Sequence, residues 1–156
     1  MKELSDDPRV VFLGQGVREK GTFMSTTLTE VPLEKRIELP VMEDAQLGMS
    51  IGMALAGIVP VSVYPRFNFL ILAMNQLVNH LDVMRPHVIV RVGVGSSHPL
   101  DPGPQHTGDM TKAFRLLMPN TTIVRLENPE SIQREYRNAL HRAGPTVLVE
   151  IADLYG

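Results

Sequence analysis

Four side chains in this sequence have the types and the spacing that proton transfer or ring binding would need. Glu43 stands at the start of an apolar, small-residue stretch, residues 45–64, and Phe67 and Phe69 follow that stretch. His106 lies in GSSHPLDPGPQHTGD, residues 95–109, which reads as a long loop. A carboxylate beside an apolar wall is a common device for proton transfer. Aromatic rings suit flat heterocycles, and long loops in compact domains are usually functional.

Each of these residues also has an ordinary structural explanation. Glu43 can be a helix-start carboxylate that the helix dipole stabilises. Phe67 and Phe69 can be core residues, and His106 can be a solvent-facing loop residue. From the residues alone the structural explanations are favoured, so a catalytic role needs further support.

The elements that would position these residues alternate between strands and helices. Short apolar segments rich in β-branched residues predict strands at residues 9–13, 36–39, 61–64, 88–94, 122–126 and 146–151. Helices are predicted at 44–56, 67–84, 112–118 and 129–143. Several strands are apolar on both faces, which indicates a mostly parallel sheet covered on both sides. The expected fold is therefore an α/β domain with three layers, α/β/α, and with ligands outside the carboxyl ends of its strands.

Composition places the chain among globular proteins and excludes several kinds of chemistry. Its 156 residues, 44% hydrophobic and 21% charged, fit one domain with a full core. No cysteine is present, which excludes disulfides, thiolate catalysis and cysteine-bound metals. A net charge of -2 gives no reason to expect nucleic acid or an anionic membrane as a partner. The charged N-terminus lacks the pattern of a signal peptide, so a cytoplasmic protein is expected.

Familiar nucleotide, hydrolase and metal motifs are missing. Gly14-Gln15-Gly16 follows a strand, but no third glycine completes a dinucleotide fingerprint. There is no GxxxxGK[ST] loop, no GxSxG elbow and no GDG-type motif for magnesium and diphosphate. The five histidines lack the spacing of a zinc motif. Gly57 and Pro60 interrupt the apolar stretch, which leaves a helix too short to cross a membrane.

The order of several segments nevertheless resembles a known family. The segments are LPVMED at 39–44, AGIVPV at 56–61, YPRFNF at 64–69 and NQLVN at 75–79. They resemble TPISE, AGLRPV, FMTFNF and DQVIN in the β subunit of thiamine-diphosphate-dependent 2-oxo acid dehydrogenases of the pyruvate dehydrogenase type. More widely, the chain is similar to the pyrimidine-binding domain of transketolase-like enzymes. GPQHT at 103–107 resembles the family's histidine loop, and GPTVLVEIADLYG at 144–156 resembles the end of its first domain.

This resemblance implies roles for the four side chains. Glu43 would hydrogen-bond a pyrimidine nitrogen of thiamine diphosphate and so activate the cofactor for attack on a 2-oxo acid. Phe67 and Phe69 fall where the family places aromatic rings against the pyrimidine. His106 falls on a family histidine near the substrate. The implied catalytic residues are thus Glu43 and His106, and the implied cofactor-binding residues are Glu43, Phe67 and Phe69.

The resemblance also implies that the chain carries half of an active site. Residues 1–156 would form a single pyrimidine-binding domain, without most of the family's first helix and without its carboxyl-terminal domain. The diphosphate and its magnesium ion would be held by an α-subunit-like partner, in an assembly with homodimer contacts or of α2β2 type. The substrate would be a 2-oxo acid or a ketose, and the reaction decarboxylation or ketol transfer. The alternative is a non-catalytic assembly or regulatory module that keeps the fold.

The chain departs from the family pattern at several positions. Gln15 stands where the family usually has an acidic residue, and Pro65 and Arg66 replace smaller or apolar residues. The family often binds a structural potassium ion through Asp and Asn before its last strand. Residues 141–145, HRAGP, do not supply them, so no potassium site is expected.

Overall fold

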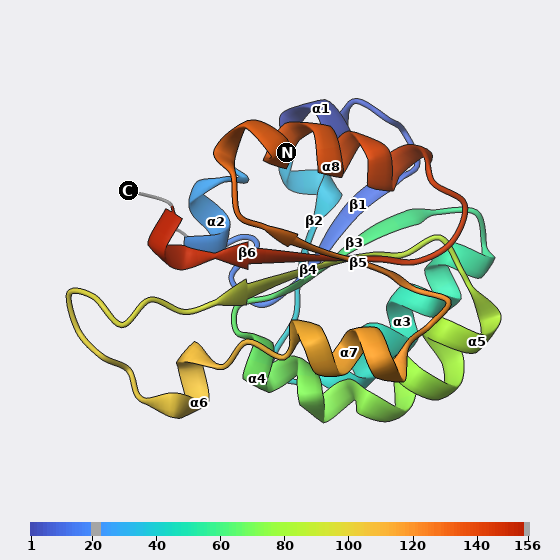
Figure 1. Cartoon of the computed structure of the whole chain (residues 1–156). Coiled ribbons are helices and arrows are strands. Elements are labelled where there is room, and N and C mark those ends of the chain that lie inside the picture. Colours follow the sequence, from blue (N-terminus) through green and yellow to red (C-terminus); the bar gives the residue numbers. More distant parts are fainter. Residues whose placement is uncertain (20–22, 155–156) are drawn as a thin grey trace.

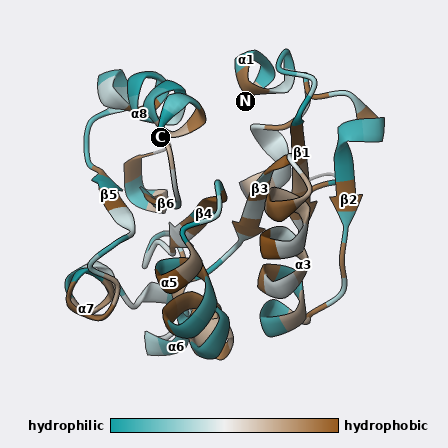
Figure 2. Cartoon of the chain, turned by 90° about the vertical axis from the view of Figure 1, so that its right-hand side faces the viewer, coloured by the Kyte–Doolittle hydropathy of each residue, from teal (hydrophilic) through white to brown (hydrophobic). Residues whose placement is uncertain are grey.

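The structure, a computed structural model, describes residues 1–19 and 23–154 and is built on a sheet of six parallel strands. Their order across the sheet is β2-β1-β3-β4-β6-β5 (Figures 1 and 2). The strands are β1 (Val10–Gly14), β2 (Arg36–Glu38), β3 (Val59–Tyr64), β4 (Ile89–Val94), β5 (Thr122–Leu126) and β6 (Thr146–Ile151). The expected α/β fold is confirmed, and each of the six predicted strands is present.

Helices cover both faces of this sheet, which gives the three layers (Figures 1 and 2). One face carries α3 (Glu43–Leu55), α4 (Phe67–Leu70), η2 (Ile71–Ala73), η3 (Gln76–Leu81), α5 (Asp82–Met84) and α7 (Thr111–Leu117). The other face carries α1 (Lys2–Ser5), α2 (Phe23–Thr26) and α8 (Pro129–His141). Short helices in the connections are η1 (Leu33–Lys35), α6 (Pro104–Thr107) and η4 (Ala152–Leu154).

The helix predicted over residues 67–84 is one helical run with several backbone geometries. α4 passes into the 3-10 turn η2, and η3 is a π-helix of six residues before α5 closes the run. The run ends at Arg85, whose φ of 55° is the left-handed conformation that commonly terminates helices. π-helical segments are rare and interrupt the usual i to i−4 hydrogen bonding. Apolar spacing does not distinguish them from an α-helix, so the sequence predicted the run but not its geometry.

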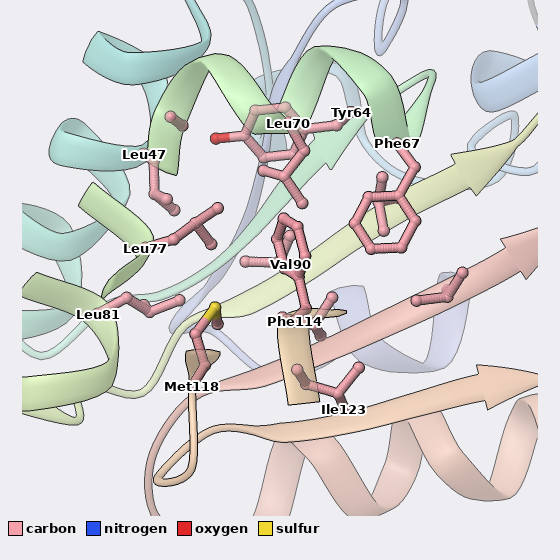
Figure 3. Packing of buried hydrophobic residues seen from close by; sticks show 14 of the residues in the cluster. Leu47, Tyr64, Phe67, Leu70, Leu77, Leu81, Val90, Phe114, Met118 and Ile123 are labelled. Carbon is pink, nitrogen blue, oxygen red and sulfur yellow. The ribbon is translucent and has the colours of Figure 1, made fainter. Parts of the chain in front are cut away.

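The core on the α3 face is a continuous apolar cluster between helices and sheet (Figure 3). Leu47 from α3, Leu77 from η3 and Val90 of β4 are members of this cluster. The ring of Phe67 is fully buried and packs edge-on against Phe114 of α7, with ring centroids 4.8 Å apart. Full burial of such a side chain contributes about 1.5–3 kcal/mol. Phe67 therefore joins the start of α4 to α7.

Gly48 and Gly52 form a stripe of small residues on α3, and this stripe is mostly open. A Cβ on Gly48 would have only ordinary contact with the side chain of Gln76, and one on Gly52 would meet nothing within 4 Å. No part of the chain that the structure describes makes the close backbone approach that this stripe would permit. α3 has 13 residues, and in the described segments no helix is long and apolar enough to cross a membrane.

A buried ion pair lies on the opposite face of the sheet, between β4 and β6. Arg91 donates from Nη2 and Nε to the Glu150 carboxylate at 2.7 and 3.0 Å, and both side chains are at most 1% exposed. The Tyr136 hydroxyl of α8 donates to the same carboxylate at 2.6 Å. Arg91 Nη1 also donates to the Met24 carbonyl of α2 at 3.3 Å. One charge pair thus connects α2 and α8 to the centre of the sheet.

Removing one partner of this pair should lower the free energy of unfolding more than replacing both partners. Arg91→Met leaves Glu150 buried and uncompensated, and we expect a loss of about 3–5 kcal/mol in the free energy of unfolding. The double variant Arg91→Met, Glu150→Leu should lose less than this single variant, as measured by urea unfolding at pH 7. Arg134→Gln removes an exposed arginine of α8 and should change stability by no more than about 0.5 kcal/mol. A double variant that is less stable than Arg91→Met would contradict this account.

A second prediction concerns pH and the contact between the first and last helices. Glu3 of α1 accepts hydrogen bonds from Arg137 and Gln133 of α8, and these bonds, Arg137 first, lower the pKa of Glu3 from 4.5 to about 2. A lowered pKa stabilises the fold while the carboxyl group is ionised in both states. The contribution is therefore complete above about pH 4.5 and declines toward pH 2. Glu3→Gln should lower the melting temperature slightly at pH 7, and the difference from the parent chain should shrink across that window.

Candidate functional site at the carboxyl edge of the sheet

The carboxyl ends of β1 and β3 lie next to each other where the path of the chain across the sheet reverses. From β1 the chain continues to β2 at one edge, whereas from β3 it continues to β4 on the other side. The two connections therefore leave in opposite directions and open a crevice between the strand ends. In open parallel sheets this topological switch point is the usual place for a ligand.

A pocket of about 520 Å³ lies at this point. Its walls are formed by residues that follow β1, β3 and β4 in separate parts of the chain, together with Met24 of α2. Its volume is within the range of small-molecule sites. The lining residues are Gln15, Gly16, Glu19, Met24, Pro65, Arg66, Phe69 and His106.

His106 is held against the end of β4 by the main chain. The Gly95 amide donates to the His106 carbonyl at 3.0 Å. A Cβ on Gly95 would lie 2.3 Å from that carbonyl oxygen, so the approach requires glycine. The imidazole stands edge-on to the ring of Phe69, with centroids 5.4 Å apart and planes at 86°. Two predicted site residues are thus in contact at the pocket wall.

Asn68 of α4 fixes the same loop from the other side. Its amide nitrogen donates to the Pro104 carbonyl at 3.3 Å, and its oxygen accepts from the Gly108 amide at 3.1 Å. These two bonds span α6, the helix that carries His106. The side chain of one helix therefore sets the position of the histidine loop.

Glu43 is the first residue of α3 and lies at the same edge of the domain. Its side chain is buried, with 6% exposure, and within residues 1–19 and 23–154 its carboxylate makes no hydrogen bond or ion pair. Its main-chain carbonyl accepts from the Tyr64 hydroxyl at 3.3 Å. Glu43 as a residue is thus largely buried, while its backbone is fixed to the end of β3.

A chain of buried hydrogen bonds holds this junction of α3 and β3. Gln46 donates to Ser62 at 3.1 Å, Ser62 donates to Tyr64 at 3.3 Å, and Tyr64 donates to the Glu43 carbonyl. Burial raises the pKa of Tyr64, and the negative charges of Glu43 and Asp44 raise it further. The hydroxyl therefore stays protonated and remains a donor at any physiological pH.

The predicted site residues fall into two groups. Phe69 and His106 line the pocket, whereas Glu43 and Phe67 are outside its lining. Phe67 is part of the core beside Phe114, so its cofactor contact stays a prediction, as does the proton-transfer role of Glu43. In the described part of the chain no group of three or more metal-ligating side chains gathers that could hold an ion.

Two pocket residues stand out in the sequence only because they depart from the family pattern. Gln15 and Arg66 follow β1 and β3, and both have a buried nitrogen without a hydrogen-bond partner in the described segments. The available signal was their position directly after two strands. That signal becomes informative only once the two strands are known to be neighbours.

Comparison with protein families places the whole chain in one of them. Residues 1–156 match the model of the transketolase pyrimidine-binding domain. Subunit beta-4 of the chloroplastic pyruvate dehydrogenase E1 component from Oryza sativa subsp. japonica is 26% identical, over 99% of this chain and 41% of that protein. The corresponding beta subunit from Staurastrum punctulatum is 25% identical, over 99% of this chain and 49% of that protein. The chain thus spans less than half the length of these relatives.

Solved structures agree with the fold. The inactive β4 tetramer of a split-gene transketolase superposes with a TM-score of 0.76 at 16% identity, over 96% of this chain and 47% of that chain. Transketolase from Leishmania mexicana superposes with a TM-score of 0.73 at 18% identity, over 96% of this chain and 25% of that chain. At these identities the likeness establishes the fold.

Removal of the Asn68 side chain should release the histidine loop. Asn68→Ala deletes both bonds that span α6, and we expect a local loss of about 1–3 kcal/mol. Amide exchange over residues 96–109 should then accelerate by roughly 5- to 100-fold, as followed by hydrogen–deuterium exchange mass spectrometry. Asn79→Ala removes an exposed asparagine whose side chain donates to Asn75, and it is the matched control. Equal exchange rates in the two variants would show that Asn68 does not hold the loop.

Proposed function

We propose, because this chain belongs to the family of transketolase pyrimidine-binding domains, that it supplies the pyrimidine-binding half of a thiamine-diphosphate-dependent enzyme. The proposed reaction is 2-oxo acid decarboxylation of the dehydrogenase type, since the similar proteins include pyruvate dehydrogenase E1 beta subunits. The observation that carries the proposal is the Glu43 carboxylate. It belongs to a largely buried residue at the carboxyl edge of the sheet and has no partner among the described residues.

The residues present fit this cofactor. A carboxyl oxygen without an internal partner can share a proton with a ring nitrogen, and Glu43 is such a group. Phe69 presents a half-buried ring beside His106, and aromatic rings favour offset or edge contacts with a flat heterocycle. When bound, thiamine diphosphate supplies a carbon nucleophile and an electron sink for bond cleavage beside a carbonyl.

In this proposal the residues of the chain hold, orient and exchange protons. Glu43 holds a proton at a carboxyl oxygen and gives it to, or takes it from, the pyrimidine ring. The Gln46, Ser62 and Tyr64 chain keeps its backbone in place, so the carboxylate is carried by a fixed point on α3 during that exchange. His106 faces the substrate side, where its imidazole can donate or accept a hydrogen bond.

We further propose that a separate diphosphate-binding chain or domain, which holds the magnesium ion, completes the site. The open stripe on α3 supports a covering partner, because a Cβ on Gly52 would meet nothing within 4 Å in the described chain, and Met49 and Leu55 are 41% and 63% exposed. Small residues let a second backbone approach closely, and exposed apolar side chains gain from burial. The chain should then be inactive by itself.

The test is reconstitution with the partner that co-purifies with this chain. The mixture, with magnesium and thiamine diphosphate, should release carbon dioxide from a 2-oxo acid. Glu43→Gln should reduce kcat by about 10²- to 10⁴-fold, the usual contribution of a positioned proton-transfer group. Asp44→Asn changes the adjacent, exposed carboxylate and should have little effect. Full activity of Glu43→Gln would show that this carboxylate does not activate the cofactor.

Calorimetry separates the catalytic proposal from a module that only keeps the fold. The parent chain with its partner should bind thiamine diphosphate, and Glu43→Gln should bind it more weakly. An assembly that forms without any thiamine diphosphate binding would overturn the proposal and favour a role in assembly or regulation.

A further inference from the structure

We infer that the pocket at the carboxyl ends of β1 and β3 binds the oxyanion of a small organic acid through the guanidinium of Arg66. The inference deepens the proposed function, and it rests on that function only for the view that this acid is the reacting substrate. The binding site itself is a property of this chain and can be measured without cofactor or partner.

Arg66 brings a positive charge to the pocket, and no described residue supplies a counter-ion. Its Nη1 donates to the Pro65 carbonyl at 2.7 Å, while its Nε is buried and has no acceptor within the described segments. No carboxylate of residues 1–19 or 23–154 comes within 4.0 Å of it. A guanidinium carries five N–H donors in a planar fork that matches the oxygens of a carboxylate or phosphate. The Nη2 hydrogens and the second Nη1 hydrogen have no acceptor in the described part of the chain, so they are the donors that such a group would meet.

A second polar side chain converges on the same pocket from β1. Gln15 lines the pocket on the side of β1. Its Nε2 is also buried and has no acceptor in the part of the chain described. Buried donors without acceptors are uncommon in folded proteins, and each one calls for an explanation. Two of them belong to side chains that line one pocket, and one of the two is part of a charged guanidinium, so an oxygen-rich ligand is their shared explanation.

The acidic residues near the pocket do not neutralise Arg66. Glu19 lines the pocket, but it is exposed and forms no ion pair with the guanidinium. Glu38 is engaged elsewhere, because its carboxylate accepts from the Gly16 and Arg18 amides at 2.6 and 2.7 Å. Glu19 therefore acts as a repulsive charge toward an incoming anion, and its removal should strengthen binding.

The other residues that line the pocket indicate what the uncharged part of the ligand should be. Met24, Pro65 and Phe69 are apolar, and His106 stands edge-on to Phe69. A molecule with one charged end on Arg66 and a short carbon body against Phe69 fits these surfaces. The volume of about 520 Å³ suits a small acid and leaves room for a cofactor ring beside it.

The experiment titrates the full chain, alone, with three matched probes followed by NMR. Butyrate carries a carboxylate, propylphosphonate carries a tetrahedral anion, and butyramide has the carbon body of butyrate without charge. We expect saturable shifts of the His106 ring and Arg66 Nε–H signals with at least one anion. Butyramide should bind about 10- to 100-fold more weakly than butyrate or propylphosphonate, because a charge-assisted hydrogen bond is lost. The anion that binds more tightly tells whether the natural ligand carries a carboxylate or a phosphate-like group.

Variants then assign the binding to one side chain. Arg66→Gln should weaken anion binding by about 10- to 100-fold, whereas Arg134→Gln, which removes a remote exposed arginine, should leave it unchanged. Glu19→Gln should tighten it by about 2- to 10-fold, since a nearby like charge is removed. Arg66→Lys keeps the charge and should retain part of the affinity if Arg66→Gln fails to fold.

Three results would overturn the inference: equal binding of butyramide and the anions, unchanged anion binding by Arg66→Gln, or no shift up to about 0.1 M of either anion. None of them involves thiamine diphosphate. A failed Glu43→Gln test would therefore remove the proposed reaction and leave the anion site standing, and the reverse outcome would remove the site alone.

Discussion

All six strands run parallel, so every loop that follows a strand leaves the sheet at the same edge. The candidate site depends on this constraint, because its polar residues come from loops after β1, β3 and β4. The reversal between β1 and β3 adds the space between two of these loops. Gly14 lets the two strand ends approach, since its φ is 140° and a Cβ there would lie 2.2 Å from the Val63 carbonyl oxygen. A side chain at that position would separate the strand ends that form the pocket floor.

Buried polar groups on both faces of the sheet then fix the helices near this edge. On one face, Gln46 and Tyr64 connect α3 to β3, and on the other, Arg91 and Glu150 connect β4 and β6 to α2 and α8. Burying each group costs free energy unless its hydrogen-bond partners are present, so a partial rearrangement of these helices is disfavoured. The same interactions that hold the helices on the sheet therefore hold the backbone of Glu43 and the position of Met24 relative to the strand ends.

Much of this fold follows from the sequence, but the site follows only in part. β5 and β6 occupy the residues predicted for them, because short runs of β-branched residues bounded by turn residues are a strong strand signal. The aromatic pair shows the limit. Phe67 and Phe69 are two positions apart in a helix, roughly 200° around its axis, so one ring enters the core while the other reaches the pocket. Arg91 pairs with a residue 59 positions away, and no local pattern predicts such a partner.

In the proposed function, the short turn from β3 to α4 would separate substrate recognition from cofactor chemistry. Arg66 faces the pocket, the adjacent Phe67 fills the core, and Glu43 belongs to a different element, to which the strand is joined through Tyr64. A change of charge at position 66 therefore alters the pocket without disturbing the packing of α4 or the hydrogen bonds that hold α3. In that proposal, differential affinity for alternative substrates would come from such contacts, whereas the Glu43 carboxylate would serve all of them. The arrangement allows the ligand preference of this pocket to vary while the Glu43 carboxylate stays in its place.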